Sequence, residues 1–237
     1  MTELSDLAGQ HFMTSWSGGK DCALALDRAM RAGGVSALIL TTMLDDAPRS
    51  RGHGLHADVL QEQARAMGIP IRMLPTTWKD YTANYLNELK TIHETSRIRH
   101  GVFGDIDLQP HRDWVERVCM DCRVTAHLPL WEECRWKLLH EVFERRIRCM
   151  IISVKDGSLP RHMLGQMLTP ELIDQIVDAG ADACGENGEY HTLVVDGPMF
   201  RRPIKVEPGQ QILRDGYWFL DVRVEHPACH QLTEATC

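Results

Sequence analysis

A glycine-rich turn near the N-terminus holds the residues best suited to bind a phosphate group. A short apolar run, His11-Phe12-Met13, leads to Gly18 and Gly19, and a helical pattern follows. Glycines let the backbone approach a ligand closely, and the first turn of a helix presents unpaired N–H groups with a partial positive charge. Lys20 adds a full positive charge at the same point. The sequence therefore predicts a strand, a tight turn and a helix whose N-terminus binds an anion.

The spacing of this turn differs from the common phosphate loop of NTPases. That loop, G-x-x-x-x-G-K-[ST], needs glycine at the position of Thr14 and a hydroxyl residue at the position of Asp21. A different nucleotide chemistry is therefore indicated. The plain alternative is an ordinary glycine-rich connection with a surface lysine.

A second polar segment, Gly185 to Thr192, contains two carboxylates, an amide, an imidazole and a hydroxyl. A purely structural interpretation exists, because Asn-Gly is a strong hairpin signal and glutamates are usually solvated. The functional interpretation is that Glu186 and Glu189 hold Mg²⁺, orient an ammonium ion or act as a base. The two glutamates are three positions apart with a glycine between them, so we expect both to face one pocket.

Composition limits the possible functions. The chain has 237 residues, 43% of them hydrophobic and 25% charged, which is typical of a globular protein with a full core. A formal charge of −7 argues against broad nucleic-acid binding and favours a small-molecule or protein partner. The N-terminus has no signal-peptide pattern, and no apolar run is long enough to span a membrane. The eight cysteines are therefore expected to be reduced thiols, and the compartment to be the cytosol.

Strands and helices alternate through the first half of the sequence. We expect strands at 11–13, 35–44, 71–74 and 101–104, and helices at 23–31, 56–67, 79–95 and 111–122. This alternation predicts an α/β fold with a parallel, doubly wound sheet. Ligands bind at the carboxyl ends of such strands, where Ser17 and Asp105 would meet. The long polar loop 45–54 is expected to lie over that cleft.

The second half predicts a smaller α+β unit. A helix at 132–145 and a strand at 149–154 precede a short helix that begins at Pro170, with Thr169 as its cap. Short strands are expected at 193–195, 204–206, 211–213 and 217–224. We expect a nucleotide-binding domain at 1–130, a substrate-binding domain at 131–226 and a loose tail at 227–237.

Several motifs resemble one known family. The run Ser17 to Cys22 is similar to the S-G-G-x-D-S loop of the PP-loop ATP pyrophosphatases, with Cys22 in place of the usual serine. Gly185 to Thr192, followed by Asp196 to Phe200, resembles the G-E-N/G-G-E-Y/F-x-T and D-G-P-L/M-F signature of the diphthine–ammonia ligase family. Gly104-Asp105-Ile106 and Pro129-Leu130-Trp131 match further landmarks of that family. These landmarks occur in the same order and span most of the chain.

The resemblance implies a fold, a reaction and a set of site residues. The fold would be adenine nucleotide alpha hydrolase-like. ATP, with Mg²⁺, would adenylate the carboxylate of diphthine on elongation factor 2, and ammonia would displace AMP. The residues expected to bind the nucleotide are Ser15, Ser17, Gly18, Gly19, Lys20, Asp21, Cys22, Gly104 and Asp105. Those expected to bind the substrate are Gly185, Glu186, Asn187, Gly188, Glu189 and Thr192. Lys20, Asp21, Glu186 and Glu189 are the expected catalytic residues.

Two alternative functions need separate consideration. A tRNA-modifying PP-loop enzyme and a nucleotide sensor without turnover are the alternatives, and a homo-oligomer stays open.

Cys119 and Cys122 could bind zinc, but because no second matching pair follows we expect them to be ordinary thiols. Cys22 lies at a helix N-terminus beside a lysine, so we expect its thiolate to be favoured and reactive. We also expect Lys20 to be a cleft lysine that contributes little to the core.

Overall fold

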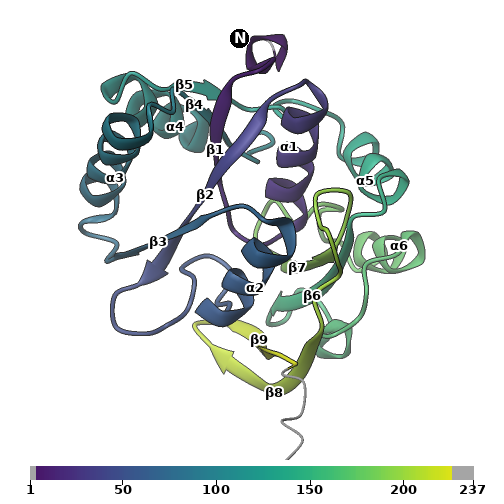
Figure 1. Cartoon of the computed structure of the whole chain (residues 1–237). Coiled ribbons are helices and arrows are strands. Elements are labelled where there is room, and N and C mark those ends of the chain that lie inside the picture. The colour runs from purple at the N-terminus through teal and green to yellow at the C-terminus, as the bar shows by residue number, and fades with distance from the viewer. Residues whose placement is uncertain (1–3, 226–237) are drawn as a thin grey trace, which may run out of the picture.

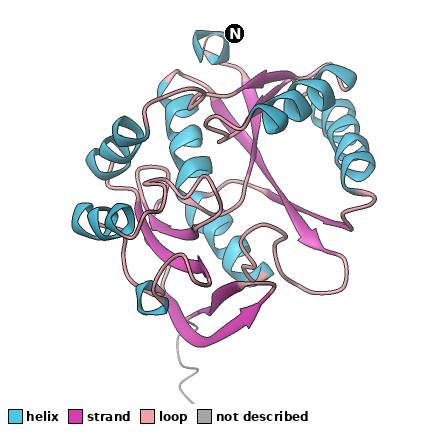
Figure 2. Ribbon diagram, turned by 180° about the vertical axis from the view of Figure 1, so that it is seen from behind, coloured by secondary structure: helices cyan, strands magenta, loops and turns pink. Residues whose placement is uncertain are grey.

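Two sheets, one parallel and one antiparallel, organise the chain (Figure 1). The structure is a computed structural model, and it describes residues 4–225. Figure 2 shows the two sheets as separate sets of strands, with helices around both. No helix in residues 4–225 is both long enough and apolar enough to cross a lipid bilayer. The predicted tail at 227–237 lies outside the described residues.

The first half forms the parallel sheet, with strand order β3-β2-β1-β4-β5 and parallel pairing throughout. This confirms the predicted parallel α/β fold. Its elements in chain order are η1 (Leu4–Leu7), β1 (His11–Ser15), α1 (Lys20–Arg31), β2 (Val35–Leu44), α2 (Ala57–Met67), β3 (Ile71–Thr76), α3 (Tyr81–Ser96), β4 (His100–Val102), α4 (Gln109–Asp121) and β5 (Thr125–His127).

The second half forms the antiparallel sheet, with strand order β7-β6-β9-β8. This confirms the expected smaller α+β region. Its elements are α5 (Arg135–Glu144), β6 (Arg148–Lys155), η2 (Arg161–Met163), α6 (Pro170–Asp178), β7 (Tyr190–Asp196), β8 (Val206–Arg214) and β9 (Tyr217–Val224). The division into two domains at residue 130 stays a prediction, although the change of sheet falls between β5 and α5.

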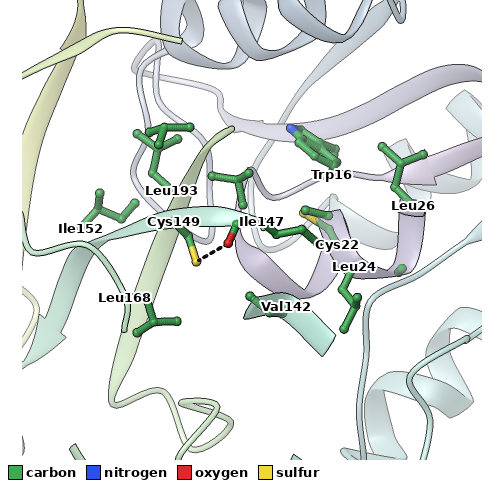
Figure 3. Close-up of a cluster of buried hydrophobic side chains, with 14 of the residues drawn as sticks. Trp16, Cys22, Leu24, Leu26, Val142, Ile147, Cys149, Ile152, Leu168 and Leu193 are labelled. Carbon is green, nitrogen blue, oxygen red and sulfur yellow. Dashed lines mark hydrogen bonds between the residues drawn. The ribbon is translucent and has the colours of Figure 1, made fainter. Parts of the chain in front are cut away.

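Alternating side chains of β1 point into two different cores. Phe12 belongs to a large core, whereas its neighbour Met13 belongs to a smaller one formed mainly with α3 and α4. The large core runs from α1 into the second half without interruption. Figure 3 shows Cys22 and Leu24 of α1 in the same cluster as Ile152 and Leu193. The N-terminal helix that follows the glycine turn is therefore packed directly against the second sheet.

Several element boundaries differ from the sequence-based expectation, each for a physical reason. The helix expected from Glu132 begins at Arg135, because Glu132 has a left-handed backbone with φ 57°. The two strands expected at 204–206 and 211–213 are one strand, β8, which begins at Val206 and continues through Pro208 and Gly209. A register shift between Pro208 and Gln211 accommodates them, and β8 is an edge strand, where proline is tolerated. The three-residue β5 was not expected.

Candidate functional site

A cavity of about 390 Å³ opens where the carboxyl ends of β1 and β4 meet the segment before β7. This is the predicted edge of the parallel sheet, and Ser17 and Asp105 both line it. Its volume lies in the range of small-molecule sites. Its lining includes these members of the two predicted sets: Ser15, Ser17, Lys20, Asp21, Cys22, Gly104, Asp105, Gly185, Glu186, Gly188 and Thr192. Gly18, Gly19, Asn187 and Glu189 do not line it.

The glycine turn is held in place by residues far away in the sequence. Gly18 has φ +87°, a left-handed backbone that favours glycine. Its carbonyl accepts hydrogen bonds from the backbone N–H of Val194 (2.8 Å) and from Nε2 of Gln63 (3.1 Å). The backbone N–H of Lys20 donates to Oγ1 of Thr192 (3.0 Å). The two signature segments therefore touch directly across the cavity.

Lys20 is part of the core as well as of the cavity, since it is only 3% exposed. Its ammonium donates to Oδ2 of Asp21 (2.9 Å) and to the carbonyl of Cys184, and lies 5.3 Å from the ring centre of Tyr190. Burial alone would lower the pKa of Lys20, but Asp21 and the other partners hold it well above its usual value. The expectation that this lysine contributes little to the core is therefore wrong.

Cys22 is buried beneath the turn rather than presented as a reactive thiolate. Its Sγ donates to the carbonyl of Gly19 (3.1 Å) and lies 3.3 Å from Oγ of Ser17. Burial raises the pKa of the thiol despite hydrogen bonds from Ser17. The expectation that the helix N-terminus and the neighbouring lysine favour the thiolate is wrong, because the cost of burying a charge is larger here.

The two glutamates of the second segment have different environments. Glu186 lines the cavity, where burial and the nearby charges of Asp21 and Asp107 raise its pKa to about 7, against the opposing effect of Lys20 and Arg135. A carboxyl group with this pKa changes between acid and base near neutral pH.

Glu189 instead holds its own turn together. It is 7% exposed, and its carboxylate accepts from the backbone N–H of Asp182 (3.0 Å) and from both the backbone N–H and Nδ2 of Asn187 (3.1 Å each). Burial would raise the pKa of Glu189, but these donors lower it. The expectation that both glutamates face one pocket therefore holds for Glu186 alone, because Glu189 is used by the turn.

Charged side chains from both halves lie in the lining of the cavity or close enough to Glu186 to affect its pKa. His111 and Asp105 lie 3.2 Å apart, and this contact raises the pKa of His111. Arg135 pairs with Asp107 (2.7 Å) in the first half and with Asp182 (2.5 Å) in the second. Sequence reasoning missed both His111 and Arg135. The fold alone brings Asp107 and Asp182 to Arg135, whereas His111 is six positions from Asp105, a spacing that could have indicated it.

Two histidines that were not among the predicted site residues separate this cavity from a second one. The rings of His53 and His191 are stacked, with centres 4.5 Å apart and planes inclined by 25°. Both line the main cavity and also an adjoining one of about 260 Å³, which is bordered by Trp78 and Tyr81. His191 lies inside the second signature, and His53 lies in the loop expected over the cleft. These positions in the sequence could have indicated both histidines. Loop residues 50–53 line the second cavity.

The donor set of the main cavity suits Mg²⁺. Asp21, Asp105 and Glu186 supply carboxylate oxygens to its lining, and Mg²⁺ takes one or two carboxylates together with substrate phosphates and water. Cys119 and Cys122 are buried in the smaller core, away from this cavity. Within residues 4–225 no group of three or more His, Cys, Asp or Glu side chains forms a metal cluster. The six cysteines that the structure describes are unpaired.

Comparisons with known proteins agree with this geometry. Two family models match the chain: the diphthamide synthase N-terminal domain at residues 11–126 and the diphthamide synthase C-terminal domain at residues 135–226. The human diphthine–ammonia ligase is 31% identical over 138 residues, which cover 56% of this chain and 52% of that protein. The mouse enzyme is 30% identical over the same shares, so the match spans about half the length of these relatives.

A zebrafish relative matches over a longer range. The diphthine–ammonia ligase of Danio rerio is 25% identical over 234 residues, covering 87% of this chain and 90% of that protein. Among solved structures, a predicted subunit of a tRNA methyltransferase from Methanocaldococcus jannaschii is 14% identical, with a TM-score of 0.46 over 79% of this chain and 97% of that chain. Because the two family models together match nearly the whole described sequence, this chain belongs to the diphthamide synthase family.

Proposed function

We propose that this chain is an ATP-dependent ligase that converts a carboxylate into an amide and releases AMP and pyrophosphate. The observation that carries the proposal is the contact between the Lys20 N–H and Thr192 Oγ1, which unites both signatures at one cavity. The diphthine–ammonia ligase name of the relatives supports the same chemistry. The alternatives, a tRNA-modifying enzyme and a nucleotide sensor, are not favoured, and the net charge of −7 counts against the first.

The two adjoining cavities suit the two ends of ATP. The main cavity offers Lys20 and the N-terminus of α1 to the phosphates, where cationic and N–H donors are worth most. The second cavity offers aromatic rings, Trp78 and Tyr81, to the base. Trp78 also stacks with the guanidinium of Arg51, which lies 4.7 Å from its ring. We assign the pyrophosphate half to the first cavity and the nucleoside half to the second.

In the first step a carboxylate oxygen of the acceptor attacks the α-phosphorus, and pyrophosphate leaves. A free carboxylate is a poor electrophile, and this step gives its carbon a good leaving group, AMP. Negative charge develops on the phosphate oxygens, and preorganised donors stabilise it. Lys20 and the N–H groups at the start of α1 are these donors, and Asp21 holds the side-chain ammonium of Lys20 in place.

Ammonia attacks the acyl-adenylate in the second step, so that a C–N bond forms and the C–O bond to AMP breaks. Ammonium is not nucleophilic, and a carboxylate can bind it and accept its proton. Glu186 lines the cavity with a pKa near 7 and is the residue we assign to this task. Glu189 then acts through the turn that positions Glu186.

Mg²⁺ would shield the phosphate charge and polarise the phosphorus. We propose Asp21 and Asp105 as the protein groups that hold it, because both carboxylates line the cavity beside the phosphate loop. Such an ion depends mainly on the nucleotide for its ligands.

Diphthine is the acceptor that the names of the relatives suggest, and on this basis elongation factor 2 would carry it. A homo-oligomer remains compatible with the proposal. The unpaired cysteines support a reducing compartment, and we propose the cytoplasm.

An isotope experiment tests the reaction directly. The chain is incubated with ATP, Mg²⁺, ammonium and an acceptor whose carboxylate carries ¹⁸O. Transfer of one ¹⁸O atom into AMP, together with amide formation, supports the ligase. AMP formation that depends on tRNA would support the modifying enzyme instead, and ATP binding without turnover of any acceptor would support the sensor.

A further inference from the structure

The stacked pair His53 and His191 lies at the junction of the two cavities. Four residues line both of them: Ser15, Ser17, His53 and His191. If ATP occupies both cavities as proposed above, its α-phosphate lies between the pyrophosphate half in the main cavity and the nucleoside half in the second cavity. The group attacked in the first step then lies against these shared residues.

The hydrogen bonding of His53 fixes which ring nitrogen is free. Its Nδ1 lies 3.0 Å from the carbonyl oxygen of Thr192. A carbonyl only accepts, so Nδ1 must carry the proton, and in the neutral ring Nε2 is the unprotonated nitrogen. The same carbonyl would also stabilise a positively charged ring. His191 lacks such a fixed partner among the hydrogen bonds of the described residues.

His53 also lies close to the phosphate loop. A Cβ placed on Gly19 would be only 2.5 Å from Cε1 of His53, so the ring approaches the turn at a distance that only glycine permits. The backbone N–H of Lys20 and Nδ1 of His53 both contact Thr192, through its hydroxyl and its carbonyl respectively. The loop, the histidine and the second signature therefore form one connected unit.

We propose that nucleotide binding protonates His53, and that its Nε2–H then donates to the α-phosphate during adenylation. This inference rests on the proposed function. The proton comes from solvent when ATP binds and returns when AMP leaves. Adenylation itself forms the bond between the carboxylate oxygen and phosphorus and breaks the bond to pyrophosphate, without consuming that proton.

The surrounding charges explain why the ligand controls this proton. In the free protein burial lowers the pKa of His53 to about 4, and the positive charge of Lys20 lowers it as well, while the bond to Thr192 raises it. Burial, His53 and Lys20 lower the pKa of His191 to about 3, and Asp21, which follows Lys20 on α1, opposes them. Arg51 borders the second cavity from the loop that carries His53. A triphosphate offsets these cations, and a nearby opposite charge raises a histidine pKa by about 1–3 units.

The stack limits uptake to one proton. Two charged imidazoles in contact repel each other, and each is already disfavoured by burial. We therefore expect His53 to carry the single proton and His191 to remain neutral beside it.

Calorimetry of ATP binding tests the proposal. ATP with Mg²⁺, without acceptor, is titrated at pH 6 in two buffers of different ionisation enthalpy, and the difference gives the protons taken up. His53→Gln keeps an N–H donor but cannot titrate. We expect ATP affinity to fall by up to about 10-fold, which corresponds to about 1.4 kcal/mol, and the uptake to fall by up to one proton. Comparing the variant with the wild type cancels protons exchanged by the nucleotide itself.

Three variants and a spectrum identify the proton acceptor. His140→Gln alters an exposed histidine on α5 and is the matched control, while His111→Gln and His191→Phe change the other imidazoles of the cavity. All three should retain the uptake. The Cε1–H NMR signal of His53, assigned through bonds in isotope-labelled wild-type protein, should titrate with a higher pKa when ATP is bound.

Unchanged uptake in His53→Gln, or its loss in His111→Gln or His191→Phe instead, overturns the inference while leaving the ligase intact. A pKa of the His53 signal that is the same with and without ATP would also overturn the inference. This measurement uses the wild-type protein, so it remains possible if the variant fails to fold. Absence of ATP binding by the wild type overturns the proposed function and this inference with it.

Discussion

The two signature segments use their residues in different ways. In the first segment, Ser17 to Cys22, backbone groups hold the segment in place: the carbonyl of Gly18 accepts two hydrogen bonds and the N–H of Lys20 donates to Thr192. In the second segment we assign the proposed chemistry to side chains, and these have different roles. Glu186 lines the cavity, whereas Glu189 is bonded within its own turn.

This comparison separates the residues that build the site from those that can act on a ligand. A segment dense in polar residues must satisfy its own buried backbone groups before it can bind anything else. Glu189 satisfies two backbone N–H groups, and its partner Glu186 is thereby left free for the cavity. Lys20 belongs to both categories, because its ammonium contacts Asp21 and Cys184 as well as facing the cavity.

The largest combined effect, on stability and on ATP binding, is expected from Lys20→Ala, which removes an ammonium bonded to Asp21 and to the carbonyl just before the second segment. Asp21 and the carbonyl of Cys184 lose a partner in a largely buried site. Breaking a fully buried ion pair costs about 3–5 kcal/mol. Because the side chain of Asp21 is 30% exposed, we expect the free energy of unfolding of Lys20→Ala to fall by about 2–3 kcal/mol. ATP affinity should fall about 10- to 100-fold.

Urea unfolding and calorimetric ATP titration measure the two effects of Lys20→Ala separately. Lys20→Arg keeps the charge and is the comparison. A free energy of unfolding equal to that of the wild type would show that Lys20 serves only the ligand. Equal ATP affinity would remove the phosphate loop assignment.

The paired variants Glu186→Gln and Glu189→Gln test the division inside the second segment. Glu189→Gln replaces an acceptor of three N–H bonds, so the free energy of unfolding should fall by about 1–3 kcal/mol. Its pyrophosphate exchange and its amide formation should weaken together. Glu186→Gln should be at least as stable as the wild type at neutral pH and retain the exchange, but lose amide formation by about 100-fold or more.

Acceptor-dependent exchange of labelled pyrophosphate into ATP, run beside an amide assay, distinguishes these outcomes. If Glu186→Gln lost both activities equally, the ammonia role would be wrong and Glu186 would belong to the nucleotide step. If Glu189→Gln were as stable as the wild type, the structural role of Glu189 would be wrong.

The pH dependence of amide formation should report Glu186. The base must be ionised, so with a pKa of about 7 the rate per free ammonia should rise through pH 7 and fall below it. The stability of the fold depends on pH in the opposite direction. A carboxyl group whose folded pKa is raised above 4.5 favours folding at low pH, and that contribution is lost as pH rises from about 4.5 to about 7.

Glu186→Gln should therefore flatten both curves, the rate curve and the curve of unfolding free energy relative to the wild type. A rate limb near pH 7 that persists in the variant would assign the titration to another group.

Local signals in the sequence were sufficient for most of the fold. The bounds of β2 and β9 and the Thr169 cap of α6, whose Oγ1 accepts from the Leu172 N–H at 3.2 Å, agree with expectation. Continuous apolar runs and a capping residue act over a few positions, so short-range reasoning suffices. β5 was missed because three residues carry no recognisable period.

Burial at the site depends on contacts that no local pattern contains. The environment of Lys20 is made by Cys184 and Thr192, and the contact with Thr192 joins residues 172 positions apart. A distant contact also stacks His53 on His191, whereas Glu189 is occupied by groups of its own turn. Residue types could therefore indicate which chemistry is present, whereas only the fold could show which groups remain free to perform it.

The smallest effect is expected at Cys22, the residue that departs from the S-G-G-x-D-S pattern. It is 4% exposed and its pKa is raised by burial, whereas Cys134 at the start of α5 is exposed. Because the thiolate is the nucleophile, brief alkylation followed by peptide mapping should label Cys134 at least about 10-fold faster than Cys22. Cys22→Ser should keep the bond to the Gly19 carbonyl that Sγ makes at 3.1 Å, and change the free energy of unfolding by less than about 1 kcal/mol. Labelling of Cys22 that is faster than that of Cys134, and is slowed by ATP, would show that the turn opens in solution. The contrast between a turn fixed by its backbone and a segment that acts through side chains would then be wrong.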